Sequence, residues 1–313
     1  MKAVYWLIAS FITLSGLGTM AVGASLMKKD QKNTQYISSK ESYEGIKNLD
    51  LDLGSEDLHV IAIEDTNVCT VELCEVPEQV KVAQEGDTLR IYLEPNNAFQ
   101  MFDFDNTQNR VNVFVPADLF DSVEINNGSG DVEVLNVLAD YMNAKAGSGS
   151  VYIDGTTSRV GNVKSGSGGI GIVNTTFTEE SELHTGSGGI SCEEFTGNKV
   201  EAESGSGSIY FLNSTVGKTK AKSGSGGVFM TDQTLTDDIE CTSGSGDIEI
   251  TVCGDQADYV LDVTLGSGDP DFEGIGGKKN ADPHTIKIKS GSGDASVHFV
   301  SAGEAVEEVE IEE

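Results

Sequence analysis

Basic residues are scarce in this chain of 313 residues. It has 20 Lys and Arg against 51 Asp and Glu, which gives a formal net charge of −31. Nucleic acids and anionic lipid surfaces are held mainly by Lys and Arg, so this charge opposes binding of either by the folded part. We therefore expect no nucleic-acid partner, and we expect attraction to cationic ligands instead.

Residues that build catalytic and metal centres are also few. The four His residues and the five Cys residues show no C-x-x-C or H-E-x-x-H spacing, and no G-x-S-x-G elbow is present. The cysteines are Cys69, Cys74, Cys192, Cys241 and Cys253. We predict no catalytic residue, no cofactor site and no metal site.

Glycine, in contrast, is abundant, and much of it recurs regularly. A Gly-Ser-Gly triplet occurs nine times, at a nearly constant spacing of about 19–20 residues that lengthens over the last two copies. A fixed period of this size is typical of a stacked repeat, in which each unit buries its apolar face against its neighbours. We expect structural corners at the first glycine of each triplet: Gly128, Gly147, Gly166, Gly186, Gly205, Gly224, Gly244, Gly266 and Gly291.

Apolar and polar residues alternate on both sides of each triplet. In the first unit Val123 and Ile125 precede the triplet and Val132 and Val134 follow it. A period of two indicates a half-buried strand. The glycines would allow positive φ and a tight corner without a Cβ clash, and the triplet Ser hydroxyl could bond a corner amide. The sequence thus predicts an all-β fold, a right-handed single-stranded β-helix (solenoid) of about 19–20-residue coils.

One long apolar segment is present, at the N-terminus. The stretch from Ala3 to Met27 contains no charged residue and is followed by Lys28, Lys29 and Lys32. As a helix it would be about 37 Å long, enough to cross the roughly 30 Å hydrocarbon core of a bilayer. We expect residues 1–28 to be a transmembrane anchor, with a cleaved signal peptide as the alternative.

The rest of the chain divides by its pattern. We expect a linker over residues 29–42, an N-terminal β cap of irregular coils over 43–122, the repeat β-helix over 123–300 and an acidic tail over 301–313. A loop is expected at 96–108. Alternation predicts strands in the cap at residues 49–53, 58–64, 69–76, 80–83, 89–94 and 110–116.

Three patterns that could carry chemistry have simpler structural explanations. The segment Gly166–Gly171 fits G-x-G-x-x-G, but no helix follows it and it is one corner among nine. Acidic residues follow four triplets and could bind Ca²⁺, yet calcium repeats of the Gly-rich type have about nine residues. Asp269 and Asp271 could imitate the paired carboxylates of a glycosidase, but they are better explained as turn residues. The four acidic residues are Asp131, Asp247, Asp269 and Asp294.

Two further groups of side chains have expected places. Cys192 and Cys241 fall in inward columns, where Cys packs as a small apolar residue, and they lie too many coils apart for a disulfide. His184, Tyr152, Tyr210 and Phe229 are expected on the outside as an aromatic strip. This strip could contact a ligand. The alternative is that its side chains only pack against their exposed neighbours.

The line from Val111 to Val134, VNVFVPADLFDSVEINNGSGDVEV, carries a family resemblance. It combines an alternating strand ending in Val-Pro, an Asp-Leu-Phe, a short strand and the first Gly-Ser-Gly-Asp-Val. This pattern resembles the bacterial "putative adhesin" domain family of unknown function, and the resemblance extends over residues 43–300. It implies a membrane-tethered β-helix at the cell envelope and brings no catalytic residues.

Together these observations predict a non-enzymatic, membrane-anchored surface protein of the cell envelope, acting in adhesion, in interaction or in envelope-stress sensing. A self-assembling β-helix scaffold is the alternative, and a carbohydrate-active β-helix enzyme is a third hypothesis. Expected partners are the membrane, through the N-terminal helix, and an envelope protein, glycan or cationic peptide. We expect a single-pass cell-membrane protein with the β-helix outside. Positive charges after the span and unpaired cysteines leave a cytoplasmic orientation open.

Overall fold

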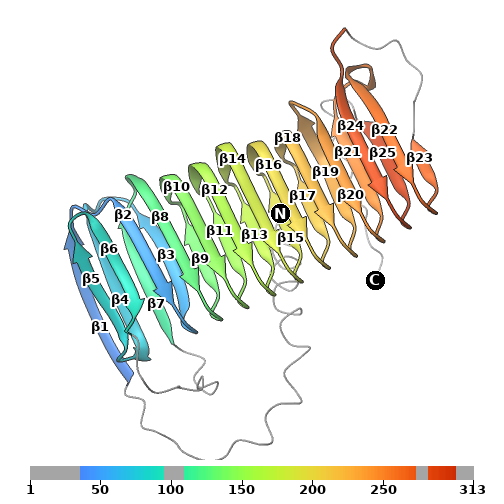
Figure 1. The fold of residues 1–313 in the computed structure, drawn as a ribbon. Coiled ribbons are helices and arrows are strands. Elements are labelled where there is room, and N and C mark those ends of the chain that lie inside the picture. Colours follow the sequence, from blue (N-terminus) through green and yellow to red (C-terminus); the bar gives the residue numbers. More distant parts are fainter. Residues whose placement is uncertain (1–35, 95–108, 273–280, 301–313) are drawn as a thin grey trace, which may run out of the picture.

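A computed structural model describes residues 36–94, 109–272 and 281–300, which form a straight rod of stacked β-coils (Figure 1). The predicted all-β solenoid is confirmed, and the one helix described is a single 3-10 turn at Gln256–Asp258. Among the residues described, no helix is long and apolar enough to cross a membrane. The predicted anchor at 1–28, the loop at 96–108 and the tail at 301–313 lie outside the described residues.

Each repeat coil contributes one strand to each of two parallel sheets, one with longer strands and one with shorter strands. In the repeat, the long-strand sheet contains β8 Leu119–Asn127, β10 Leu138–Ala146, β12 Thr157–Ser165, β14 Thr176–Thr185, β16 Thr196–Ser204, β18 Thr215–Ser223 and β20 Ile239–Ser243. The short-strand sheet contains β9 Val132–Leu135, β11 Val151–Asp154, β13 Ile170–Val173, β15 Ile190–Glu193, β17 Ile209–Leu212, β19 Val228–Leu235 and β21 Ile248–Cys253.

Equivalent positions of successive coils lie side by side, as the alternation predicts. Ala144 pairs with Ile125 on one side and Val163 on the other, and Ile153 pairs with Val134 and Ile172. These residues are fully buried between the two sheets. The interior of the rod is therefore a continuous column of apolar side chains, and the alternate residues of every strand form its outer walls.

The triplet glycines are required for close approach between coils. A Cβ on Gly166 would lie 2.2 Å from the carbonyl oxygen of Gly147, and one on Gly168 would lie 2.3 Å from that of Gly149. The predicted absence of room for a Cβ is confirmed. The prediction of positive φ is wrong, because none of the described triplet glycines has a left-handed backbone.

The hydroxyl that bonds the corner belongs to the residue before the triplet, and the assignment to the triplet Ser is corrected. Ser165 Oγ donates to Gly149 O at 2.8 Å, and Ser204 Oγ donates to Gly188 O at 2.9 Å. The equivalent hydroxyl of Ser243 accepts from Gly246 N at 2.8 Å. These side chains are buried, and they tie each corner to the coil before it. The members of this ladder are Ser165, Thr185, Ser204, Ser223, Ser243 and Ser290.

Positive φ occurs at the opposite corner of the coil, where the chain leaves the short-strand sheet. The residues there are Asn136, Gly155, Asn174, Glu194, Asn213 and Asp232, with φ between 46° and 63°. Asn, Asp and Gly tolerate this conformation, whereas Glu gains nothing from a local side-chain bond and bears the full steric penalty. Glu194 also lies beside Glu193, whose pKa is raised by burial and then by the charges of Glu194 and Asp154.

We expect Glu194→Asn to raise the free energy of unfolding by about 0.5–1 kcal/mol at neutral pH. A raised carboxyl pKa in the folded state means that stability falls as the pH rises through that pKa. Removing the charge at 194 lessens this fall in stability at neutral pH. The stabilisation by Glu194→Asn should therefore be smaller at about pH 4, where carboxylates become protonated. Thermal unfolding of the parent protein and of Glu194→Asn at neutral pH and at about pH 4 measures this gain in stability. An equal gain in stability at both pH values would contradict the contribution of charge repulsion. The matched reverse variant is Asn174→Glu, which should lower stability at the equivalent position.

The C-terminal coils do not stack in sequence order. This end contains β22 Tyr259–Leu265, β23 Pro270–Phe272, β24 His284–Ser290 and β25 Ala295–Val300. Strand β24 lies between β20 and β22, and β25 lies between β21 and β23. A regular repeat predicts that each unit stacks on its neighbours in sequence, and this prediction is wrong here, since the coil of Gly291 inserts between those of Gly244 and Gly266.

The N-terminal end combines two further parallel rungs with antiparallel strands that cover them. The strands are β1 Tyr36–Glu44, β2 Asn48–Leu53, β3 Asp57–Ile63, β4 Val68–Pro77, β5 Val80–Glu85, β6 Thr88–Leu93 and β7 Arg110–Pro116. The six strands predicted for the cap match β2 to β7 to within two residues at each end. Strands β6 and β7 run parallel beside β2 and β3. Strand β5 runs antiparallel beside β6, β4 runs antiparallel beside β7, and β1 runs antiparallel beside β4. Strand β1 begins at Tyr36, inside the stretch predicted as a linker.

A tenth corner precedes the nine triplets in the sequence. Gly54, Ser55 and Glu56 connect β2 to β3, and Gly128 of the next coil packs against Gly54. The buried carboxylate of Glu56 accepts hydrogen bonds from Gly54 N and Ser55 N, both at 3.0 Å. Glu56 thus replaces the third glycine and bonds the corner amides of its own turn.

Candidate interaction surfaces

Three of the four acidic residues that follow the triplets act as hydrogen-bond acceptors between coils. Asp131 Oδ1 accepts from Ser150 N at 2.7 Å, and Asp294 Oδ1 accepts from Asp269 N at 2.8 Å. Asp247 Oδ1 in turn accepts from Asp294 N at 2.9 Å. Each carboxylate therefore accepts a hydrogen bond from the amide of the equivalent residue in the neighbouring coil. This structural role explains why acidic residues occur at these positions.

The cysteines offer little reactive surface. Cys192 and Cys241 are buried in inward columns as predicted, and all five cysteines are free thiols. Burial raises the pKa of the Cys69 thiol to about 11 and that of Cys241 to about 12, and burial raises the pKa of Cys192 as well. Because the thiolate is the reactive form, these three side chains act as apolar packing residues.

A shallow groove of about 480 Å³ runs along the long-strand sheet where the strands meet the triplet corners. Its floor is formed by successive corner glycines, among them Gly128, Gly147, Gly166 and Gly186. Lys145, Lys164 and His184 form one wall, each one rung from the next. Lys164 pairs with Glu182 at 2.8 Å. We call this feature the corner groove.

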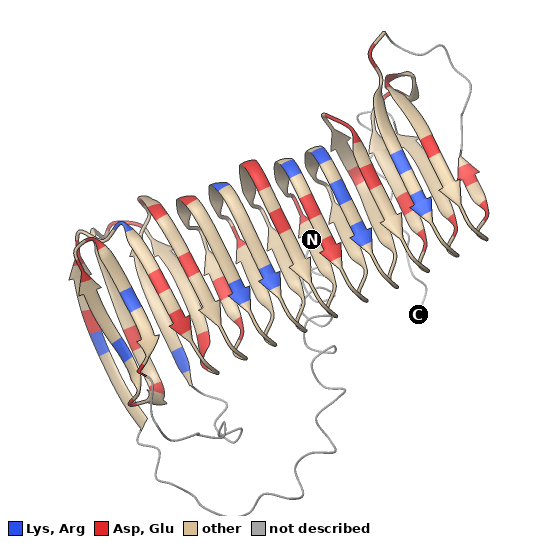
Figure 2. Ribbon diagram, in the orientation of Figure 1, with Lys and Arg blue, Asp and Glu red and all other residues tan. Residues whose placement is uncertain are grey.

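Acidic and basic side chains are unevenly placed on the rod. Figure 2 shows Asp and Glu over most coils, with Lys interrupting them along the long-strand sheet. Two lysines and a histidine at the same position of successive coils form a local exception in a chain of charge −31. Lys145, Lys164 and His184 recur at the spacing of the triplets, and this recurrence is the sequence signal that could have identified the wall.

The predicted aromatic strip is formed in part, on the other sheet. Tyr210 and Phe229 stack with ring centroids 5.0 Å apart and an interplanar angle of 14°. Tyr152 lies in the same row, separated from Tyr210 by Gly171 and Ser191. His184 is not part of the strip, because it precedes its corner and belongs to the long-strand sheet. Two small residues therefore separate Tyr152 from the stacked pair.

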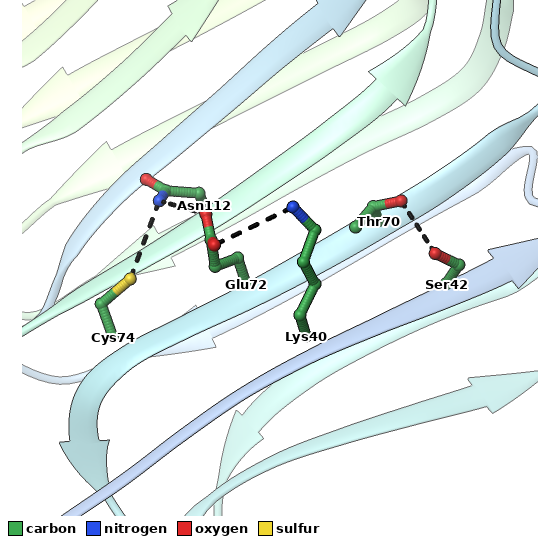
Figure 3. A network of polar contacts seen from close by, with 6 residues as sticks. All are labelled: Lys40, Ser42, Thr70, Glu72, Cys74 and Asn112. Atoms are coloured by element: carbon green, nitrogen blue, oxygen red, sulfur yellow. Dashed lines mark hydrogen bonds and ion pairs between the residues drawn. The ribbon is translucent and has the colours of Figure 1, made fainter.

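A polar network covers the outer face of the N-terminal cap (Figure 3). Glu72 on β4 receives a hydrogen bond from Asn112 Nδ2 at 3.3 Å and lies 3.9 Å from Lys40 Nζ. Cys74 Sγ lies 3.9 Å from the same amide nitrogen. Lys40, Glu72 and Cys74 border a hollow of about 700 Å³ that Arg110 also lines. Sequence reasoning missed this site, because it depends on the antiparallel packing of β1 and β4.

One cluster of possible metal ligands occurs among the described residues. Side-chain ligand atoms of Asp237, Asp238 and His284 lie within 4.8 Å of one another. Asp237 Oδ1 accepts from Asp238 N, and Asp238 Oδ1 accepts from Thr285 N, both at 2.6 Å. The two carboxylates are thus engaged with backbone amides where β24 joins β20. Asp269 and Asp271, weighed above as a catalytic pair, both lie exposed at the last rung.

Several solved structures are similar to the chain at low identity. A "putative adhesin" from Bacteroides fragilis has 14% identity and a TM-score of 0.41, covering 84% of this chain and 97% of its own. A "putative lipid binding protein" from Parabacteroides distasonis has 15% identity and a TM-score of 0.42, covering 83% and 96%. A "putative adhesin" from Parabacteroides merdae has 10% identity and a TM-score of 0.35, covering 84% and 96%.

The family comparison is more specific. No curated protein sequence matches the chain. The model of one family, Toastrack DUF4097, matches residues 46–298, which include the extra first coil, all nine triplets and the inserted C-terminal coil. This match confirms the resemblance to a domain family of unknown function. The chain belongs to the Toastrack DUF4097 family.

Proposed function

We propose that the protein is a non-catalytic, membrane-anchored interaction module of the cell envelope, which binds its partners along the outer walls of the rod. The filled interior is the observation that carries this proposal. Inward side chains such as Ile125, Ile153 and Phe195 are fully buried, so apolar side chains fill the interior of the described coils. The outer surfaces of the described residues include the corner groove, the aromatic strip and the hollow of the N-terminal cap.

Such surfaces suit extended partners. Equivalent side chains repeat at about 4.8 Å along the rod, so a linear ligand can make the same contact on several coils in succession. Open contact surfaces with charged and aromatic residues are typical of recognition, whereas catalysis needs converging groups shielded from water. This arrangement supports an adhesive or sensing role.

The proposed topology has the anchor at residues 1–28 and the rod outside the cell. The uncharged segment from Ala3 to Met27 supports the anchor, and the acidic, polar outer walls support display in an aqueous space. Trypsin sites at Lys28, Lys29 and Lys32 follow the uncharged segment and precede β1 in the sequence. They offer a direct test of topology.

We expect trypsin added to intact cells to release a fragment that contains the rod, since folded β-coils resist cleavage better than a short connection does. The matched variant Lys28→Gln, Lys29→Gln, Lys32→Gln should keep the rod on the cells. Immunoblots of cells and supernatant measure both, with a cytoplasmic protein as the control for lysis. Cleavage that occurs only after the cells are permeabilised would contradict display outside.

A further inference from the structure

The C-terminal end of the rod is an open edge among the described residues. Strand β22 pairs with β24 alone and β23 pairs with β25 alone, so the outer backbone groups of both strands lack a partner strand there. Leu261, Val263 and Leu265 of β22 are only partly buried, although Ile286 and Ile288, their neighbours in the same columns, are 0% exposed. An edge with unpaired amides and half-covered core residues is a template for one more strand.

The outer face next to this edge carries charges that alternate from rung to rung. Lys220, Glu240, Lys287 and Asp262 stand at one position of β18, β20, β24 and β22. Glu240 lies 3.9 Å from Lys287 and 2.7 Å from Lys289, and these cations hold the pKa of its carboxyl below the usual range. The alternation of charges ends at the exposed Asp262, which has a cation, Lys287, on one side only. A Lys or Arg in a strand added beside β22 would continue this alternation.

A second copy of the chain fits this edge poorly. Two copies related by a two-fold axis would pair β22 with β22 and β23 with β23, both antiparallel. Asp262 at the middle of β22 would then face itself, and so would Asp271 at the middle of β23. Like charges directly opposite destabilise a strand pair, and Pro270 cannot donate to a ladder. These are features that oppose self-pairing of an edge.

The chain's own tail is also a poor match. Residues 304–313 contain six Glu and no Lys or Arg. As an added strand the tail would set further carboxylates beside Asp262 and Asp271, which costs stability. The occupant that the charges favour is therefore basic, which the tail is not.

We propose that β22 binds an extended segment of a cationic partner protein as an additional rung of the long-strand sheet. The segment alternates apolar residues, which cover Leu261, Val263 and Leu265, with Lys or Arg, which face Asp262. Backbone hydrogen bonds to β22 supply affinity, and the charge opposite Asp262 supplies selectivity. This proposal rests on the proposed interaction function and names the partner's chemistry and its place on the rod.

The test uses the full chain in detergent micelles and short peptides that alternate Val with Lys or Val with Glu. We expect the Val–Lys peptide to bind and to slow hydrogen exchange of the β22 amides, measured by mass spectrometry. A peptide of the same composition with its Lys and Val in separate blocks should bind at least about fivefold more weakly, because it cannot cover the core residues.

Charge reversal at the edge gives the sharper result. Asp262→Lys should weaken binding of the Val–Lys peptide by about fivefold or more and strengthen binding of the Val–Glu peptide. The matched control is Asp140→Lys, which makes the same change at an exposed position of β10 in the middle of the rod and should change neither affinity. Equal effects of the two variants would overturn the proposal, since binding would then follow net charge alone.

The chain's own tail and a second copy of the chain, as alternative occupants of the edge, would each give a different result. Deletion of residues 301–313 should leave hydrogen exchange at β22 unchanged, and faster exchange in that variant would show that the tail covers the edge. A concentration-dependent dimer that Asp262→Lys alters would show a second copy there. Either result would overturn the proposal. The trypsin experiment on cells is independent of all these outcomes, so failure of the displayed-module function and failure of the edge site can be told apart.

Discussion

Replacing Gly168 by Ala is expected to lower the free energy of unfolding by about 3–4 kcal/mol, in the upper range for a single methyl group. The added Cβ would lie 2.3 Å from Gly149 O, 2.5 Å from Gly149 C and 2.7 Å from Ser150 N. All three are backbone atoms of the preceding coil, so no side chain can rotate away. The methyl group can be accommodated only if two coils move apart, which would break the hydrogen bonds between them.

The next glycine in the sequence supplies the control. A Cβ on Gly169 would meet nothing closer than Gly189 O at 3.4 Å, which is an ordinary contact. Gly169→Ala should therefore change stability by less than about 0.5 kcal/mol, or increase it slightly by reducing the freedom of the unfolded chain. Urea unfolding followed by circular dichroism compares the two variants. Equal destabilisation by both would show that loss of glycine itself, and not the distance between coils, is what matters.

These two glycines also show what the sequence can and cannot predict. Periodic spacing locates the corners and the alternation locates the strands, because both are local properties of the chain. Whether a glycine serves close approach or positive φ depends on the neighbouring coil, which spacing does not describe. The residues with positive φ are mostly Asn and Asp at the other corner, such as Asn174 and Asn213. Their recurrence after each short strand was a readable signal.

Order along the rod is the second property that local patterns do not determine. The last two spacings between triplets are longer than the others, and they mark the place where β24 inserts between β20 and β22. An insertion of a few residues predicts a longer connection but not its path. Strand β1 was missed for another reason, since its sequence YISSKESYE has few apolar residues and most of it is exposed at the edge of the sheet.

The candidate surfaces were predictable only in part. Outward positions within one strand can be assigned from the alternation, so Tyr210 and Phe229 were correctly placed in one row. Which of the two sheets a residue faces depends on its side of the corner, and this separates His184 from them. The corner groove and the cap hollow arise from several coils together. Their residues become neighbours only through the stacking.

Replacing Phe195 by Ala is expected to lower the free energy of unfolding by about 3–5 kcal/mol. Phe195 is fully buried and lies between Phe177 and Phe211, with ring centroids 5.8 Å and 6.3 Å away. Small neighbours make room for this column, since a Cβ on Gly197 would lie 2.7 Å from the Phe195 ring. Without the ring, Gly197 has no side chain that could fill the cavity, so little of the loss can be recovered by repacking.

Phe195→Leu should cost about 1–1.5 kcal/mol, since most of the apolar volume is kept. Tyr210→Ala removes an aromatic ring from the outer wall, where the side chain is 36% exposed, and should cost about 1 kcal/mol or less through its lost stacking with Phe229. Thermal unfolding of the three variants gives the order. A loss in Tyr210→Ala as large as that in Phe195→Ala would contradict the assignment of the interior column as the main source of stability.

The position of Phe195 in the middle of the rod leads to a second expected result for the same variant. In a stacked repeat each coil is stabilised mainly by its two neighbours, so one weak coil reduces the coupling between the parts on either side. Hydrogen exchange in Phe195→Ala should then report two unfolding units, one on each side of β15 and β16, where the parent protein reports one. A variant that loses the same stability but still exchanges as a single unit would show that coupling along the rod does not pass through the Phe column, and that the backbone ladders of the two sheets carry it instead.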